Sequence, residues 1–105
     1  MIGINTIHEL AILGQMAFKK HTVLRMYQRR ITEDEVKEAL VHSKIVEEYP
    51  NDYSLPSCLV LGYTRIKRPI HAVLVIDKKE PMLWVVTVYE PSLSEWEEGF
   101  EKRRK

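Results

Sequence analysis

The chain has 105 residues, 45% hydrophobic and 30% charged, with a net charge of +1. This length fits a single domain over residues 1–105, the apolar fraction excludes a disordered chain, and the one cysteine excludes an internal disulfide. The charge is segregated: the segment from Lys19 to Arg30 holds five basic residues and no acid, whereas Glu90–Glu101 holds five glutamates and no base. A local basic surface therefore keeps an anionic partner possible.

The lengths of the apolar runs and the N-terminal residues bear on the cellular location of the protein. None approaches the roughly 20 residues of a membrane helix. The N-terminus lacks the basic start and apolar stretch of a secretory signal. We therefore expect a cytoplasmic protein without membrane contact.

The first part of the chain, residues 6–43, is expected to be helical. Thr6–Glu9 has the pattern of a capping box, and Gly14 suits a left-handed helix end, which together predict a helix over Thr6–Leu13. Gln15–Lys20 is ambiguous and allows a short extended segment. Thr32–Glu35 is a second capping box, with acids in the first turn, and predicts a helix to about His42 or Ser43.

Between these two lies an amphipathic helix predicted over His21–Arg30. Its apolar arc on a helical wheel holds Val23, Leu24 and Tyr27. Its opposite arc is polar and basic and holds His21, Arg25, Gln28 and Arg29. The histidine and arginines at four-residue spacing are neighbours that repel one another, so an anion bound there would relieve this repulsion.

The second part, residues 45–90, changes to the period of β-strands. The expected strands are Ile45–Tyr49, Cys58–Ile66, Ile70–Ile76 and Leu83–Tyr89, with a turn at Pro50–Asp52 after the first. Short links favour antiparallel neighbours. A short helix over 92–100 and a basic tail over 101–105 complete the prediction. The fold class is α+β: N-terminal helices packed on a three- to four-stranded antiparallel sheet.

A polar cluster follows from the register of the last two strands. If the Asp77–Pro81 loop is symmetric about Lys79, His71 faces Thr87, and Tyr89 shares their face of the sheet. Histidine exchanges protons near neutral pH and arginine binds phosphate through a planar fork of donors. Together these groups suit cleavage of RNA without a metal ion, in which a 2′-hydroxyl attacks the adjacent phosphate.

Other ligands find less support. No carboxylate cluster or His–Cys spacing predicts a metal site, and the scattered glycines form no phosphate loop, so no cofactor is expected. Each candidate residue also has an alternative role that is purely structural. His71 is then a hydrogen-bonded core histidine and Tyr89 a packing residue, and Arg25 and Arg29 pair with Glu47, Glu48 or Asp52.

Several motifs, in order along the chain, resemble the Domain of Unknown Function 4258 family. They span about Lys20 to Trp96 and comprise His21–Ile31, Glu48–Pro50, Pro56–Gly62, Arg68–His71, Thr87–Pro91 and Trp96. Arg30 departs from the pattern, which commonly has glycine there.

The resemblance implies a small prokaryotic protein with a fold similar to the RelE/BrnT class of ribonuclease toxins. Such proteins are often encoded beside a zinc-finger antitoxin-like protein. The motif positions that become the candidate site are His21, Arg25, Arg29, Arg68, His71, Thr87 and Tyr89.

Two functions remain as hypotheses. The first is the toxin of a type II toxin–antitoxin pair, an endoribonuclease that needs no metal. His71 or His21 would be its acid/base, with Tyr89 and Thr87 beside them, and Arg25, Arg29 and Arg68 would bind phosphate. Its partners would be RNA and an antitoxin, which the resemblance suggests is of the zinc-finger type. The alternative is a non-catalytic module that binds nucleic acid or protein.

Overall fold

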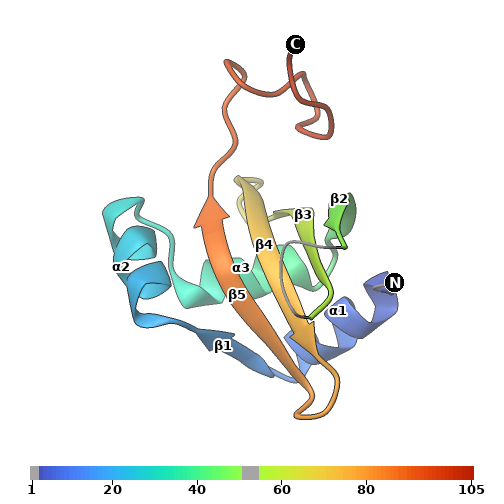
Figure 1. The fold of residues 1–105 in the computed structure, drawn as a ribbon. Coiled ribbons are helices and arrows are strands. Elements are labelled where there is room, and N and C mark those ends of the chain that lie inside the picture. Colours follow the sequence, from blue (N-terminus) through green and yellow to red (C-terminus); the bar gives the residue numbers. More distant parts are fainter. Residues whose placement is uncertain (1–2, 51–54) are drawn as a thin grey trace.

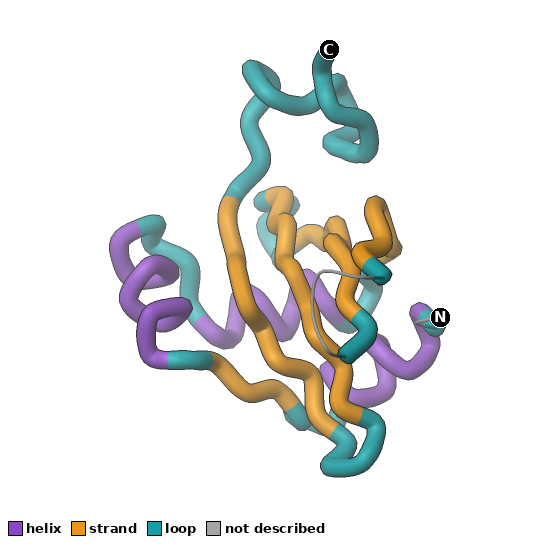
Figure 2. Tube along the Cα trace, in the orientation of Figure 1, coloured by secondary structure: helices purple, strands orange, loops and turns teal. Residues whose placement is uncertain are grey.

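The computed structural model describes residues 3–50 and 55–105, and these form three helices and one five-stranded sheet (Figure 1). The elements in chain order are α1 (Ile4–Ile12), β1 (Met16–Phe18), α2 (Lys20–Gln28), α3 (Glu33–Leu40), β2 (Lys44–Tyr49), β3 (Ser57–Tyr63), β4 (Pro69–Asp77) and β5 (Met82–Tyr89). α1 and α3 cover one face of the sheet, and α2 lies beside its β5 side (Figures 1 and 2). No helix in the described ranges combines the length and apolarity needed to cross a membrane.

The sheet has the strand order β1-β5-β4-β3-β2, and it is mixed. β2 through β5 are antiparallel neighbours, as predicted, but β1 adds a fifth strand parallel to β5. The α+β class is therefore confirmed, but the prediction of a three- to four-stranded, entirely antiparallel sheet is wrong, because the sheet has a fifth, parallel strand. Three residues are too few to show a two-residue period, and a parallel pairing joins segments far apart in the sequence.

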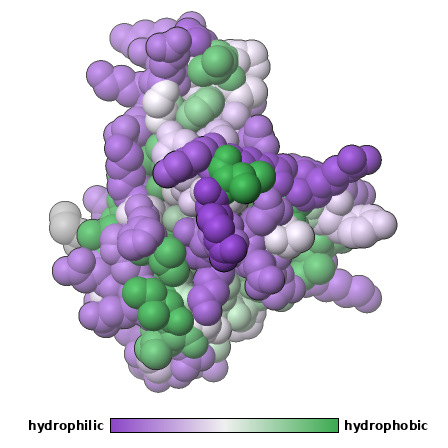
Figure 3. Space-filling model, turned by 180° about the vertical axis from the view of Figure 1, so that it is seen from behind, coloured by the Kyte–Doolittle hydropathy of each residue, from purple (hydrophilic) through white to green (hydrophobic). Residues whose placement is uncertain are grey.

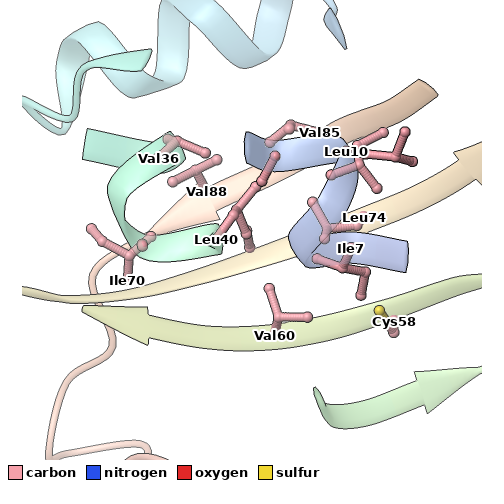
Figure 4. Close-up of a cluster of buried hydrophobic side chains, with 14 of the residues drawn as sticks. Ile7, Leu10, Val36, Leu40, Cys58, Val60, Ile70, Leu74, Val85 and Val88 are labelled. Carbon is pink, nitrogen blue, oxygen red and sulfur yellow. The ribbon is translucent and has the colours of Figure 1, made fainter. Parts of the chain in front are cut away.

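The hydrophobic core fills the space between the helices and one face of the sheet (Figure 4). α1 contributes Ile7 and Leu10, and α3 contributes Val36 and Leu40. The strand residues that point toward them are Cys58, Val60, Ile70, Leu74, Val85 and Val88. At Gly62 the backbone of α3 comes so close that a Cβ there would lie 1.9 Å from the Ala39 carbonyl oxygen.

The helix ends confirm part of the prediction. The Thr32 hydroxyl accepts a hydrogen bond from the Glu35 amide at 3.1 Å, and Glu35 Oε1 accepts one from the Thr32 amide at 3.0 Å, so the second capping box is present. The first box is wrong, because α1 begins earlier, with Gly3 as an N-cap that makes no side-chain bond. Gly14, with φ of 73°, takes the left-handed conformation expected after that helix.

The apolar arc of an amphipathic helix usually faces the core, but the apolar arc of α2 does not. Its buried residues are Thr22 and Met26. The apolar arc faces solvent instead, and Val23, Leu24 and Tyr27 are 41%, 57% and 81% exposed. The reason is that α2 lies against the edge of β5, where the sheet presents carbonyl groups rather than an apolar face.

The predicted helix over 92–100 is wrong. After β5 the chain continues through turns without a regular helix (Figure 2). The segment is fixed by specific contacts, among them an isolated bridge between Trp96 and Arg103 and an ion pair between Lys44 Nζ and Glu101 Oε2 at 2.6 Å. The basic tail is thus partly held by the domain, since Arg103 forms an ion pair with Glu47 at 2.8 Å.

Arg30 follows α2 with a φ of 57°, in the left-handed region that favours glycine. We expect Arg30→Gly to raise the free energy of unfolding by about 1 kcal/mol, because the strain of a side chain at this φ disappears. Denaturant unfolding measures the gain. Gln28→Gly, at the end of the regular helix, is the matched control and should instead lose about 1 kcal/mol. A loss at both positions would contradict the assignment of strain to Arg30.

Candidate functional site

α2 binds the edge of β5 through side chains. The parallel partner β1 ends at Phe18, which pairs with Val85, so the carbonyls of β5 beyond that point lack a strand partner on this side. The Thr22 hydroxyl donates to the Val86 carbonyl at 2.9 Å, and Arg29 Nη1 donates to the Val88 carbonyl at 2.7 Å. Two alternate carbonyls are therefore satisfied by the helix, which fixes its distance from the strand.

An open cavity of about 220 Å³ lies between α2 and β5. The residues that line it are His21, Thr22, Arg25, Arg29, Val86, Thr87 and Val88. Two arginines, one histidine and two threonines thus share one concave surface, and none of the residues that line it is acidic. This arrangement suits an anion that accepts several hydrogen bonds, such as a phosphate group.

The two arginines are placed differently. Arg29 is oriented by its bond to the Val88 carbonyl, which uses one of five N–H donors and leaves the others for a ligand. Within the described ranges, no side chain pairs with Arg25 or His21, so the alternative of ion pairs with Glu47 or Glu48 does not describe this structure. Glu47 binds Arg103 instead, and Asp52 lies outside the described residues.

His71 is fully buried in a second cluster, near the start of β4. Its Nε2 lies 2.9 Å from the Phe100 carbonyl oxygen, and its Nδ1 lies 3.0 Å from the Tyr89 hydroxyl. A carbonyl only accepts, so Nε2 carries the proton, and Nδ1 of the neutral ring accepts from Tyr89. Burial lowers the pKa of His71 and favours this neutral form, while burial raises the pKa of Tyr89.

The C-terminal segment covers this cluster. The Trp96 indole meets the His71 ring edge-on, with 4.5 Å between the ring centroids. The Arg103 guanidinium lies 4.6 Å from the Trp96 ring centroid and binds both carboxylate oxygens of Glu47. The hydrogen bond from Arg103 lowers the pKa of Glu47. His71 and Tyr89 therefore form an internal hydrogen-bonded pair under a segment anchored by Trp96 and Arg103.

Arg68 joins three elements instead of facing the cavity. Its Nη1 and Nη2 donate to the carbonyls of Arg30 and Arg29 at the end of α2, at 2.7 and 3.2 Å. Its Nε donates to Glu90 at 2.6 Å, and Nη1 lies 3.3 Å from Glu35. The hydrogen bond to Glu90 raises the pKa of Arg68. A guanidinium at the negative end of a helix stabilises that end.

The register of β4 and β5 explains why the predicted cluster of His71, Thr87 and Tyr89 does not form as one group. His71 pairs with Tyr89, and Thr87 pairs with Val73. The predicted pairing of His71 with Thr87 is wrong, because the β4–β5 turn is not centred on Lys79 and the register shifts once more between Val73 and Leu74. Thr87 lines the cavity, whereas Tyr89, two residues or about 7 Å along the strand, reaches His71.

Four predicted residues thus meet at the α2–β5 cavity: His21, Arg25, Arg29 and Thr87. The other three lie elsewhere, with His71 and Tyr89 inside the domain and Arg68 in its ion-pair network. Sequence reasoning missed Thr22, which attaches α2 to β5, and the cover of His71 by Trp96. A threonine on a predicted amphipathic helix carries no signal of a distant carbonyl partner, although the motif pattern did include Trp96.

Other chemistry has less support in the described part of the chain. Burial raises the pKa of Cys58 to about 12, so its thiol stays protonated and is a poor nucleophile. No group of three or more His, Cys, Asp or Glu side chains among the described residues is arranged to hold a metal ion.

Comparison with known proteins gives one match. The family model described as "Domain of unknown function (DUF4258)" matches residues 18–90, which is more than half of the chain and includes every candidate residue. No curated protein and no solved structure matches. The similarity of the fold to RelE/BrnT toxins therefore stays a prediction.

Proposed function

The chain belongs to the DUF4258 family, and from that premise we propose that it is the toxin of a type II toxin–antitoxin pair, which binds RNA and cleaves it without a metal ion. The observation that carries the proposal is the α2–β5 cavity, where His21, Arg25, Arg29 and Thr87 converge. The family description assigns no reaction, so the proposed chemistry rests on the residues of this cavity.

The cavity suits the phosphate of an RNA chain. Arg25 and Arg29 are one helical turn apart on the same side of α2, and a phosphate between them offsets the repulsion of their charges. Arg29 is already oriented by the Val88 carbonyl, so binding immobilises only the remaining freedom of its guanidinium. The cavity is open, as a polymer that passes through it requires.

The proposed reaction is transfer of the phosphoryl group to the 2′-oxygen. His21 takes the proton from the 2′-hydroxyl, the 2′-oxygen forms a bond to phosphorus, and the bond from phosphorus to the 5′-oxygen breaks. Water protonates the leaving oxygen, and the products are a 2′,3′-cyclic phosphate and a 5′-hydroxyl. Arg25 and Arg29 stabilise the extra negative charge on the phosphoryl oxygens, and the Thr87 hydroxyl donates to one of them.

Cleavage of a labelled RNA in EDTA tests the reaction. We expect His21→Ala to lower the rate by about 10²-fold or more, because a positioned acid/base contributes about that factor. Arg25→Ala should also lower it, whereas Arg65→Ala, which removes an exposed arginine paired with Glu38 elsewhere, should not. Equal trace activity in all four proteins would contradict the proposal, as would cleavage without a cyclic phosphate product.

The second candidate is a non-catalytic RNA-binding module, and the burial of His71 favours it, since only one histidine lines the cavity. This function predicts binding without cleavage. The affinity would fall with salt, and the slope against log salt would drop by about 0.7 for each phosphate that Arg25→Ala or Arg29→Ala no longer neutralises. Binding and cleavage measured on the same variants distinguish the two functions.

The toxin–antitoxin assignment derives from the family resemblance and has its own test. Expression of the chain should arrest growth, and co-expression of the neighbouring reading frame should restore it through a stable complex. Arrest should also be lost in His21→Ala.

A further inference from the structure

A second surface of α2 faces away from the cavity and is apolar. Val23, Leu24 and Tyr27 follow one another at helical spacing, and all three are exposed. The buried residues of α2, Thr22 and Met26, lie outside this arc. We call Val23, Leu24 and Tyr27 the outer face of α2.

The outer face is costly for a monomer in water. Each exposed apolar side chain forgoes part of the stabilisation that burial of such a group provides. On the side seen from behind, most of the surface is hydrophilic, with a few hydrophobic patches (Figure 3). Apolar side chains gathered on one helix face and bordered by charge are typical of a protein–protein contact.

The charge around the outer face identifies the kind of partner. Lys20 lies in the same arc of the wheel, and Lys19 and Arg30 flank the helix at its two ends. The whole segment from Lys19 to Arg30 has five basic residues and no acid. A second copy of this chain would place one such helix against another of the same charge. An acidic partner gains both apolar burial and charge complementarity.

We propose that the outer face of α2 binds an acidic amphipathic helix of another protein, whose apolar stripe covers Val23, Leu24 and Tyr27. The geometry is that of one helix packed on another, with anchors at the i, i+3, i+4 and i+7 positions of the partner. Glutamates beside this stripe pair with Lys20 and Arg30, which are exposed and do not line the cavity. The proposal does not depend on RNA cleavage, because the outer face and the cavity are on different sides of the helix.

A designed peptide tests this surface. The probe is a labelled helical peptide of about four turns with leucines in the i, i+3, i+4, i+7 pattern and glutamates at the other positions. Fluorescence anisotropy with the full chain measures its affinity. We expect the double variant Leu24→Ser/Tyr27→Ser to weaken binding about tenfold or more. Both side chains are exposed, so the variant should fold, and circular dichroism checks this.

Three controls make the result specific. The variant Ile12→Ser/Leu13→Ser removes apolar side chains that are 61% and 72% exposed at the end of α1, and it should bind as tightly as the wild type. A peptide with lysines for glutamates, and one with its leucines scrambled, should both bind at least about tenfold more weakly.

Other outcomes would overturn the proposal. One is an acidic peptide that binds no tighter than the scrambled one, or equally well to Leu24→Ser/Tyr27→Ser. A dimer in gel filtration that this variant abolishes would assign the outer face to a second copy. Binding to phosphatidylglycerol vesicles that the variant abolishes, without binding of the peptide, would assign it to a membrane surface.

Discussion

Replacing Gly62 with alanine is expected to lower the free energy of unfolding by about 3 kcal/mol or more. The added Cβ would lie 1.9 Å from the Ala39 carbonyl oxygen, 2.5 Å from its carbon and 3.0 Å from the Ala39 Cα. All three are backbone atoms of α3, so no side-chain rotation relieves the clash. The helix must move away from β3, which opens the core where Val36 and Leu40 are packed.

Denaturant unfolding measures this loss, and Gly3→Ala is the matched control. A Cβ at Gly3 meets only the Thr6 hydroxyl, at 3.9 Å, so its effect should stay within about 1 kcal/mol. If Gly62→Ala were as stable as the control, the close approach of α3 to β3 would be wrong.

Replacing Trp96 with alanine is expected to cost about 3 kcal/mol and to release the segment that covers His71. The indole is almost fully buried, packs edge-on against the His71 ring and supports the Arg103 guanidinium. Trp84→Ala, at the other tryptophan, is the control. Trp84 is only partly buried on β5 and is remote from the cover, so the change should not alter the titration of His71.

The effect of Trp96→Ala can also be measured through the pH dependence of the free energy of unfolding. Because burial lowers the pKa of His71 in the folded state below its ordinary 6.5, the unfolded chain binds the proton more tightly. This contribution to stability is present above about pH 6.5 and is lost as the pH falls below it. In Trp96→Ala the ring becomes hydrated, its pKa rises toward the ordinary value, and the acid-side loss should shrink. An NMR titration of His71 that is the same in both proteins would contradict this.

The predictable parts of the fold depend on short-range chemistry. The capping box of Thr32 and Glu35 places the start of α3 correctly, because this signal lies within one short segment. The four antiparallel strands follow from their composition and short links. β1 and the orientation of α2 could not be predicted in this way. Both are set by the free edge of β5, more than 50 residues later in the chain.

At the candidate site, too, features set by local sequence could be predicted and features set by distant contacts could not. The spacing of His21, Arg25 and Arg29 predicts a shared helix side, and the structure places all three at one cavity. His71 and Tyr89 were predicted to share a face of the sheet and do so, although through a different register. Their burial depends on Trp96 and Phe100, whose position follows from side-chain contacts of an irregular segment that has no periodic signal.

The attachment of α2 to β5 also sets when the cavity comes into existence. Its two walls are distant in sequence: the bond from Thr22 to Val86 spans 64 residues and that from Arg29 to Val88 spans 59. During synthesis, at about 5–20 residues per second, α2 leaves the ribosome seconds before its partner strand is made. A nascent chain therefore carries the arginines and the histidine without the cavity, and a product truncated before β5 never acquires it. Any activity of this site therefore requires a chain that extends through β5.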